Sequence, residues 1–351
     1  MNYHLFIVDE TSFKYHLEYM FVGTGKSSTN FDIELWKDIV RLKKGDKIVF
    51  YVQNLKKFYG FFEVYSHPFF DPNHYLQPNV IPFLGDNKIK LQYRALIRPY
   101  YVFKFGIDEF DLVDILPQSS KDVLWSILYR KLKGARGCSP LFENEFNVIF
   151  QKIAYINNDQ LINSNRFTFS NNQIQATNQN FTYTTNQVIP NIKQTILNGN
   201  YKESHLHALL IDFLNKQPSY TNWLGNEVYS GAGMQSIDIL TIDNHNIFNI
   251  YEVKKDEIPN NITLQIEKYI NWLKNRFQCF NINAYQPIVI GLKIEGQRKL
   301  KNRINEFRNF NKQHISLPLI YLEYEINNKD SSIDFYRLDY VNNVRYLIWK
   351  I

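Results

Sequence analysis

Over the first 152 residues, short runs of apolar and β-branched residues alternate with polar turn sequences. Gly, Asn and Asp, which favour tight turns, recur between the runs. Residues 32–42 and 120–132 instead repeat apolar residues every three to four positions, the spacing of an amphipathic helix. The pattern predicts a compact β-rich domain with flanking helices over residues 1–152. Its predicted strands are residues 4–8, 47–52, 59–65 and 92–97.

The pattern changes between residues 153 and 199, where Asn, Gln, Thr and Ser predominate and apolar residues are scattered. Such a stretch holds too few apolar residues for a core of its own. It predicts either a linker or an extended layer that lies on a neighbouring domain. We therefore expect the boundary between two domains to fall within this segment.

Residues 200–351 alternate between helical and strand-like periods, which is typical of an α/β domain. The predicted helices are residues 203–214, 263–277 and 299–310. The predicted strands are residues 227–229, 236–242, 247–254, 287–293, 317–325 and 333–340. A chain of 351 residues is long enough for two domains.

Composition and net charge bear on whether the protein could bind nucleic acid. Lys and Arg number 40 and Asp and Glu 34, which gives a net charge of +6. Aromatic residues make up 16% of the chain, with 24 Tyr and 27 Phe, and such rings either stack on bases or fill a β-rich core. This balance permits a nucleic-acid partner without requiring one.

The two cysteines, Cys138 and Cys279, lie far apart and have no metal-ligand spacing. They argue against a disulfide scaffold and for a reducing compartment. The N-terminus lacks the charged and apolar segments of a signal peptide, and no apolar run reaches about 18 residues. We therefore expect a cytoplasmic protein that does not enter a membrane.

Candidate chemistry lies on two neighbouring predicted strands. Asp238 lies in the first, Glu252 and Lys254 lie in the second, and Asp243-Asn244-His245-Asn246 between them is a tight-turn sequence. On a strand, residues two apart point to the same face, so Glu252 and Lys254 project together. Asp238 can reach that face from the partner strand of the resulting β-hairpin.

Two carboxylates and an amine in one small volume suit phosphodiester hydrolysis. Carboxylate oxygens bind Mg²⁺, which stabilises charge on the phosphate and lowers the pKa of an attacking water. A nearby lysine orients that water or adds positive charge. Glu203, on the preceding predicted helix, is a further candidate carboxylate. The alternative is a solvated cross-strand ion pair without catalytic function.

The order of these residues resembles that of the PD-(D/E)XK nuclease superfamily over about residues 200–295. The segment Gln265-Ile266-Glu267-Lys268-Tyr269 resembles the Gln-x-x-x-Tyr feature of its RecB-like and NucS-like branches. Ile237 departs from the family's usual but dispensable proline. The resemblance implies an α/β core with a mixed sheet. It assigns metal binding (Mg²⁺, with Mn²⁺ as a substitute) to Asp238 and Glu252 and assistance of the attacking water to Lys254. Gln265 and Tyr269 would support the site or contact DNA. For the last two, an ordinary amphipathic helix is the alternative.

A glycine-rich segment near the N-terminus superficially suggests a P-loop. It reads Gly-Thr-Gly-Lys-Ser-Ser over residues 23–28, but the phosphate-binding pattern needs a glycine where this chain has Met20. We therefore reject nucleoside triphosphate binding there.

A second resemblance covers most of residues 1–150. Its motifs are the Lys-Gly-Asp turn at residues 44–46, the Gly60-containing strand, and the segment at residues 131–141. They resemble the PUA-like barrels, in particular the EVE and YTH branch. The resemblance implies a β-barrel with flanking helices that takes a flipped base, often a modified one, into an aromatic pocket.

Candidate residues for this recognition follow from the resemblance. The pocket candidates are Trp36, Tyr51, Tyr59, Trp125, Ser27 and Ser28. The candidate contacts to the DNA backbone are Lys43, Lys44, Lys131, Lys133 and Arg136. The alternative for each ring is a place in the core, and for each cation an ordinary solvated surface.

The two resemblances together indicate a modification-dependent restriction endonuclease that acts on double-stranded DNA. One alternative is a restriction or repair nuclease that reads sequence or structure without a modified base. Another is a nucleic-acid binder that does not cleave, and RNA stays open as a substrate. Because a double-strand cut by chains with one site each usually needs two sites, we also expect a homodimer.

Overall fold

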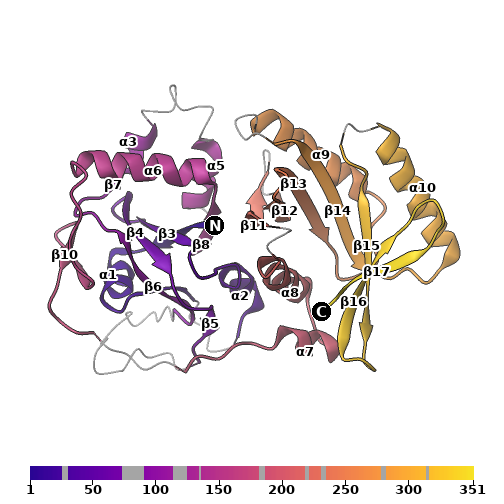
Figure 1. Ribbon diagram of the computed structural model, residues 1–351, viewed down its shortest axis with the longest axis horizontal. Coiled ribbons are helices and arrows are strands. Elements are labelled where there is room, and N and C mark those ends of the chain that lie inside the picture. Colours follow the sequence, from indigo (N-terminus) through magenta and orange to yellow (C-terminus); the bar gives the residue numbers. More distant parts are fainter. Residues whose placement is uncertain are drawn as a thin grey trace. The chain divides into compact units, whose positions relative to one another are not determined.

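A computed structural model of the chain describes residues 1–25, 31–72, 91–113, 125–133, 136–181, 186–217, 221–230, 235–277, 282–313 and 316–351. It divides into two compact units, Met1–Pro190 and Asn191–Ile351 (Figure 1). The polar segment after residue 153 therefore belongs mostly to the first unit. Within the described part of the chain, every helix is too short or too polar to span a membrane.

The first unit is built on a curled half-barrel sheet with the strand order β2-β6-β4-β3-β1-β8. Strands β1 and β3 are parallel, and the other neighbouring pairs are antiparallel. Two short strands, β5 and β7, pair with β6 and β4. The strands are β1 (Tyr3–Val8), β2 (Phe21–Thr24), β3 (Lys47–Val52), β4 (Lys57–Val64), β5 (Phe69–Phe70), β6 (Tyr93–Tyr101), β7 (Ile107–Asp108) and β8 (Cys138–Leu141).

Helices and a hairpin cover this sheet. The helices are α1 (Glu10–Glu18), α2 (Ile33–Ile39), α3 (Glu109–Val113), α5 (Trp125–Lys133) and α6 (Glu143–Ile156). The hairpin of β9 (Phe167–Ser170) and β10 (Gln173–Ala176) packs against α1, where the Phe169 ring lies 4.9 Å from that of Phe13. The polar segment thus forms an extended layer on the first unit before it reaches the second. Neither α1 nor α6 was expected from the sequence pattern.

The second unit is an α/β structure with a mixed seven-stranded sheet, ordered β11 to β17 as in the sequence. Strands β13, β14 and β15 are parallel, and the flanking pairs are antiparallel. Its elements are α7 (Ile192–Leu197), α8 (Glu203–Asn215), β11 (Trp223–Tyr229), β12 (Ser236–Ile242), β13 (Ile247–Val253), α9 (Ile262–Arg276), β14 (Ala284–Leu292), α10 (Gln297–Gln313), β15 (Ile320–Asn327), β16 (Ser332–Leu338) and β17 (Arg345–Lys350).

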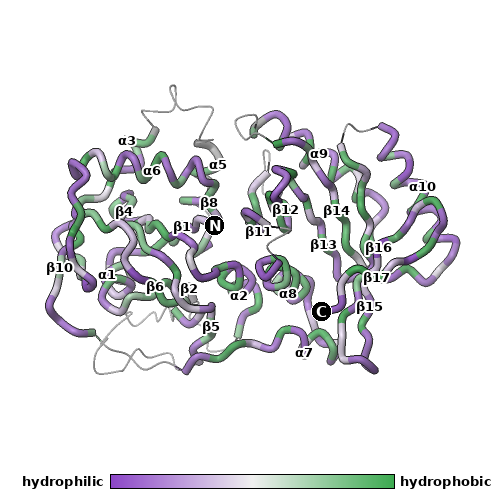
Figure 2. Tube along the Cα trace, viewed as in Figure 1, coloured by the Kyte–Doolittle hydropathy of each residue, from purple (hydrophilic) through white to green (hydrophobic). Residues whose placement is uncertain are grey.

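The apolar periodicity located most of these elements to within a few residues. Helix α8 packs against β11, β12 and β13, and α9 packs against β13. Hydrophobic residues follow the strands and the inner sides of the helices, whereas α10 is largely hydrophilic (Figure 2). The final strand, β17, was not predicted, because its apolar and polar residues do not alternate along the sequence.

A buried ion pair between α5 and α6 provides a test of the first unit. Lys131 lies 2.5 Å from Glu145, and both side chains are 3% exposed. Because E145A leaves an unpaired buried ammonium, we expect it to lower the free energy of unfolding by about 3–5 kcal/mol in urea denaturation. The exposed neighbour variant E143A should stay within about 0.5 kcal/mol of wild type. Equal losses in both variants would contradict this assignment.

Candidate active site

The predicted hairpin forms between β12 and β13. Ile239 lies opposite Tyr251 and Leu240 opposite Ile250 in an antiparallel register. Continuing this register by one residue places Asp238 beside Glu252, so the two side chains leave the sheet on the same face. The Asp238 carboxylate also accepts a hydrogen bond of 2.9 Å from the backbone N–H of Val253, which draws the two strand ends together.

Lys254 lies among three carboxylates at the end of β13. Its Nζ is 2.7 Å from Glu252 Oε1, 3.8 Å from Asp238 Oδ2 and 3.6 Å from Glu203 Oε1. The backbone N–H of Lys254 donates to Ile290 O of β14 at 2.8 Å, which fixes the end of the strand. The two acids and the amine singled out in the sequence therefore meet, with Glu203 as the third carboxylate.

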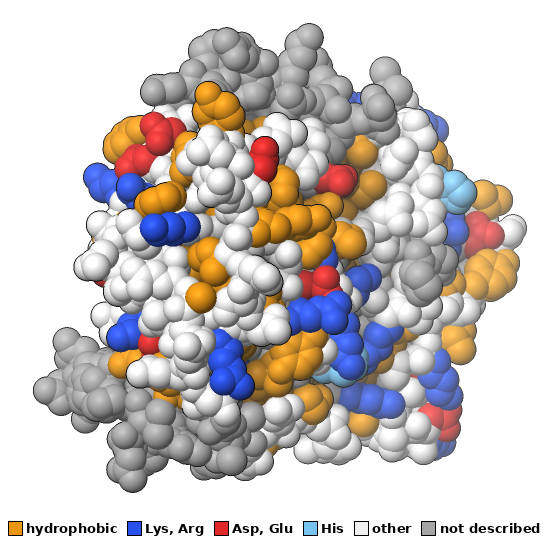
Figure 3. Space-filling model, turned by 60° about the vertical axis from the view of Figure 1, so that its left-hand side comes forward, with side chains coloured by type: hydrophobic (Ala, Val, Ile, Leu, Met, Phe, Trp, Pro, Cys, Tyr) orange, Lys and Arg blue, Asp and Glu red, His pale blue; other side chains and the backbone are white. Residues whose placement is uncertain are grey.

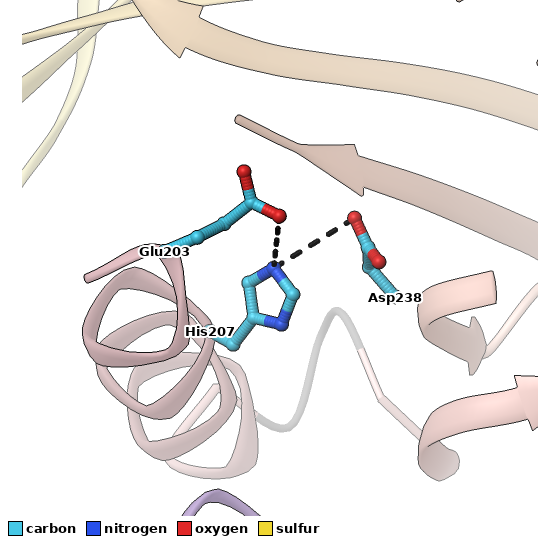
Figure 4. A group of neighbouring side chains, drawn as sticks. All are labelled: Glu203, His207 and Asp238. Atoms are coloured by element: carbon cyan, nitrogen blue, oxygen red, sulfur yellow. Dashed lines mark ion pairs between the residues drawn. The ribbon is translucent and has the colours of Figure 1, made fainter. Parts of the chain in front are cut away.

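Helix α8 adds a residue that the sequence analysis missed. Glu203 and His207 are four residues apart, so they share one face of the helix. His207 Nε2 lies 4.0 Å from Glu203 Oε1 and 3.7 Å from Asp238 Oδ2 (Figure 4). The imidazole is buried, and neither ring nitrogen has a hydrogen-bond partner among the described residues. His207 could have been identified from the sequence, because it lies four residues after Glu203 within a predicted helix.

Helix α9 contacts the cluster through Gln265 and Tyr269. Gln265 Nε2 donates to Glu252 Oε1 at 2.9 Å and lies 2.6 Å from Tyr269 Oη. Tyr269 Oη in turn donates to Ser236 O of β12 at 2.8 Å. These bonds hold one oxygen of Glu252, while the other, the buried Oε2, has no hydrogen-bond partner in the described structure.

Burial and crowding of negative charge shift the pKa values in the cluster. Burial, together with the charge of Asp238, raises the pKa of Glu252 to about 8. Burial also raises the pKa of Asp238. Burial alone would lower the pKa of Lys254, but the charges of Asp238 and Glu252 outweigh it, so this pKa is raised. Lys254 is therefore an ammonium at neutral pH, where the protonated form of Glu252 predominates in the absence of a metal ion.

The donor set suits a divalent cation. Glu203, His207 and Asp238 each offer a ligand atom, and these atoms all lie within 4.8 Å of one another. Glu252 Oε2 adds a buried oxygen without a hydrogen-bond partner in the described structure. Carboxylate oxygens suit Mg²⁺, and an imidazole nitrogen in the set also suits Mn²⁺. Buried polar atoms without partners cost stability unless a ligand satisfies them, so the residues present fit such an ion.

The described pocket candidates of the first unit are core residues. Trp36 is 2% exposed, and Tyr51 and Tyr59 are both fully buried. Tyr51 Oη donates to Glu109, and Tyr59 Oη donates to Asn172 O at 3.0 Å. In this conformation these rings face core neighbours rather than an open pocket. Ser27, Ser28 and the side chain of Trp125 lie outside the described residues.

One ring of a small aromatic cluster in the first unit, that of Phe31, reaches the surface. Phe31 is 38% exposed, and its ring centroid lies 5.4 Å from that of Phe70 and 5.9 Å from that of Tyr93. Trp36 packs on the same ring at 6.2 Å. Trp36 was a pocket candidate on sequence grounds, whereas Phe31, Phe70 and Tyr93 were not.

Three of the five cations proposed to contact the DNA backbone are paired with acids. Lys131 is buried against Glu145, so its ammonium does not reach solvent as a phosphate contact requires. Lys133 lies 3.1 Å from Glu109, and Arg136 pairs with Asp38. Lys43 is half-buried and Lys44 is exposed. On the face in Figure 3, basic side chains are interspersed with apolar and acidic ones.

No protein-family model matches the chain, and no curated protein is similar to it in sequence. Solved structures with some likeness correspond to its N-terminal part. Human THYN1 in complex with 5-methylcytosine-containing DNA is 12% identical, with 43% of this chain and 97% of that chain covered and a TM-score of 0.32. A hypothetical protein from Leishmania major is 13% identical, with 44% of this chain and 96% of that chain covered and a TM-score of 0.32. The MmI1 YTH domain is 14% identical, with 46% of this chain and 100% of that chain covered and a TM-score of 0.28.

The raised pKa of Glu252 predicts how stability depends on pH without metal. Between the ordinary glutamate pKa of 4.5 and the raised pKa of about 8, the folded chain binds this proton more strongly than the unfolded chain. The contribution of Glu252 is therefore full below pH 4.5 and is lost as pH rises toward 8. E252Q cannot ionise, so we expect its Tm relative to wild type, measured in EDTA, to increase from pH 5 to pH 8.

The matched control is D212N, which neutralises a carboxylate on the outer side of α8 that is 43% exposed. Its Tm difference from wild type should stay small, because surface substitutions usually change stability little. A difference for E252Q that is constant, or that shrinks as pH rises, would show that Glu252 is not destabilised by ionisation.

Proposed function

We propose that this chain is a metal-dependent endonuclease that hydrolyses phosphodiester bonds in DNA. The observation that carries the proposal is the convergence of Glu203, Asp238 and Glu252 on Lys254, beside a buried histidine without hydrogen-bond partners in the described structure. Asp238 and Glu252, with Glu203 and His207 beside them, would hold Mg²⁺ or Mn²⁺. Such an ion would stabilise negative charge on the phosphate and acidify a bound water.

The protein's own residues divide the remaining work. Because its pKa is raised, Lys254 stays protonated and acts as a donor to a phosphate oxygen or to the water, not as a base. Glu203 is 40% exposed, the most accessible of the three carboxylates, and is placed to accept a proton from water. Gln265 orients Glu252 through the hydrogen bond to its Oε1.

The ion pairs themselves favour a second candidate, a nucleic-acid binder without cleavage. Lys254 already balances the acids, with its closest contact at 2.7 Å to Glu252. A purely structural cluster would keep these contacts without binding metal. Cleavage that requires added metal distinguishes the endonuclease from such a binder.

The central test is a cleavage assay with duplex DNA and Mg²⁺ or Mn²⁺, with single-stranded RNA as a parallel substrate. We expect D238N, E252Q and K254A each to lower the cleavage rate by about a hundredfold or more, because charge stabilisation at the phosphate is lost. DNA affinity in EDTA should stay close to wild type, and EDTA should abolish cleavage.

The matched controls are D212N and K216Q, which remove the partners of an exposed ion pair on the same helix as Glu203. Both should cleave at the wild-type rate. Cleavage that persists at the wild-type rate in E252Q, or in EDTA, would remove the nuclease assignment.

We further propose that the first unit recognises a modified base. The support is the sequence resemblance to the EVE and YTH branch, together with the exposed ring of Phe31, which packs on the buried rings of Phe70 and Tyr93. A flipped base recovers its unstacking cost by packing on such rings. The binding of 5-methylcytosine-containing DNA by human THYN1 is a property of that protein and does not support the proposal for this chain.

This second proposal is tested with one duplex prepared with cytosine, 5-methylcytosine or 5-hydroxymethylcytosine at matched positions. We expect the full-length chain to cut one modified duplex at a lower enzyme concentration than the unmodified duplex. F31A, which shortens an exposed ring, should reduce this preference with little effect on cleavage of unmodified DNA. Equal cutting of all three duplexes would indicate a nuclease that does not depend on modification.

A further inference from the structure

Helix α10 carries most of the net charge of the chain. Its only acid is Glu306, and its cations are Arg298, Lys299, Lys301, Arg303, Arg308 and Lys312. Six minus one gives this 17-residue helix a charge of +5. The whole chain has 40 cations and 34 acids, a net charge of +6, so the rest of the sequence is nearly neutral.

Two of these six cations are engaged within the fold. Arg303 is 7% exposed and pairs with Glu306, and Lys299 lies 3.0 Å from Glu257. The other four, Arg298, Lys301, Arg308 and Lys312, are exposed. Among the described residues these four form no ion pair. Arg308 donates one hydrogen bond, to Tyr340 O, and keeps further N–H groups for a partner.

The four exposed cations line up along the helix. At 3.6 residues per turn, positions 298, 301, 308 and 312 fall within an arc of about 80°, and they span about 21 Å along the axis. We name Arg298, Lys301, Arg308 and Lys312 the basic stripe. The opposite side of the helix is buried through Ile304, Phe307 and Phe310.

Contacts within the second unit tie this helix to the candidate active site. Lys299 pairs with Glu257, and Arg303 donates to Ile258 O and to Pro259 O. Thr263 at the start of α9 donates to Glu306 at 3.0 Å. These partners lie in the segment that joins Lys254 to Gln265. Helix α10, which carries the basic stripe, is therefore held by the segment that follows Lys254.

We propose that the basic stripe binds the phosphate backbone of duplex DNA beside the bond to be cut, an inference that rests on the proposed function for the choice of DNA. Exposed cations release condensed counterions when they meet phosphates. A length of about 21 Å matches about six base pairs at 3.4 Å each. Exposed Asn302, Asn305 and Asn309 alternate with the cations, and their amides donate to phosphate and sugar oxygens.

An anionic membrane is the competing polyanion. Amphipathic helices that bind membranes insert an apolar face into the bilayer. The large apolar side chains Ile304, Phe307 and Phe310 of α10 are buried in the protein and are not available for this. The structure therefore favours nucleic acid over a lipid surface.

The test is the affinity of the full-length chain for a duplex of about 25 base pairs, measured by fluorescence anisotropy in EDTA at several salt concentrations. For R298Q/K301Q/R308Q/K312Q, we expect binding to weaken about tenfold or more near 0.1 M salt. The slope of log K against log salt should fall by about 3.6, or about 0.9 for each lost contact. R298K/R308K, which keeps the charges, should bind within about threefold of wild type.

The matched control is K14Q/K104Q/K216Q/K329Q, which removes four exposed cations elsewhere on the chain. It should bind nearly as wild type does. The inference is overturned if this control weakens binding as much as the stripe variant, or if the stripe variant binds like wild type. Loss of binding to phosphatidylserine vesicles in the stripe variant, with DNA affinity unchanged, would also overturn it.

Cleavage provides the separate readout for the proposed function. A chain that does not cut DNA but loses DNA affinity in the stripe variant keeps the stripe as a DNA-binding surface and removes the endonuclease. A chain that cuts DNA with wild-type affinity in the stripe variant keeps the endonuclease and removes the stripe. Thermal melting of each variant verifies that α10 remains folded.

Discussion

Three carboxylates crowded around a single ammonium dominate the second unit. Burial raises the pKa of Asp238, and burial together with the charge of Asp238 raises the pKa of Glu252. Lys254 makes the arrangement tolerable because its Nζ lies within 3.8 Å of all three acids. A cluster held in this way responds strongly to any further cation, since added positive charge relieves repulsion that the fold alone leaves in place.

Main-chain and amide hydrogen bonds decide where each acid points. The N–H of Val253 binds Asp238, the N–H of Lys255 binds Glu203, and the amide of Gln265 binds Glu252. These donors belong to the end of β13 and to α9, so the orientation of the acids depends on the sheet and on helix packing. Each acid is fixed before a ligand arrives, and such preorganisation makes charge stabilisation effective.

The distribution of positive charge shows why composition is a weak guide to a binding surface. Lys131, Lys133 and Arg136 are cations in a basic chain, yet each has an acidic partner in the first unit. The four cations of the basic stripe have no such partner among the described residues, and the one acid of the helix, Glu306, pairs with Arg303. These exposed cations without an acidic partner therefore lie on α10, a helix that contains none of the sequence motifs used to choose candidate residues.

The sequence by itself determined the hairpin, its turn and the residues that share its face, because strand periodicity and turn chemistry are local properties of the chain. Glu203 and the helix α9 residues were likewise found through their order in a family resemblance. Only the tertiary structure decided that His207 joins the cluster, that Tyr51 and Tyr59 are buried, and which cations are already paired. Those outcomes depend on partners distant in sequence, such as Asp238 for His207, and no local pattern encodes which side chains the fold brings within reach.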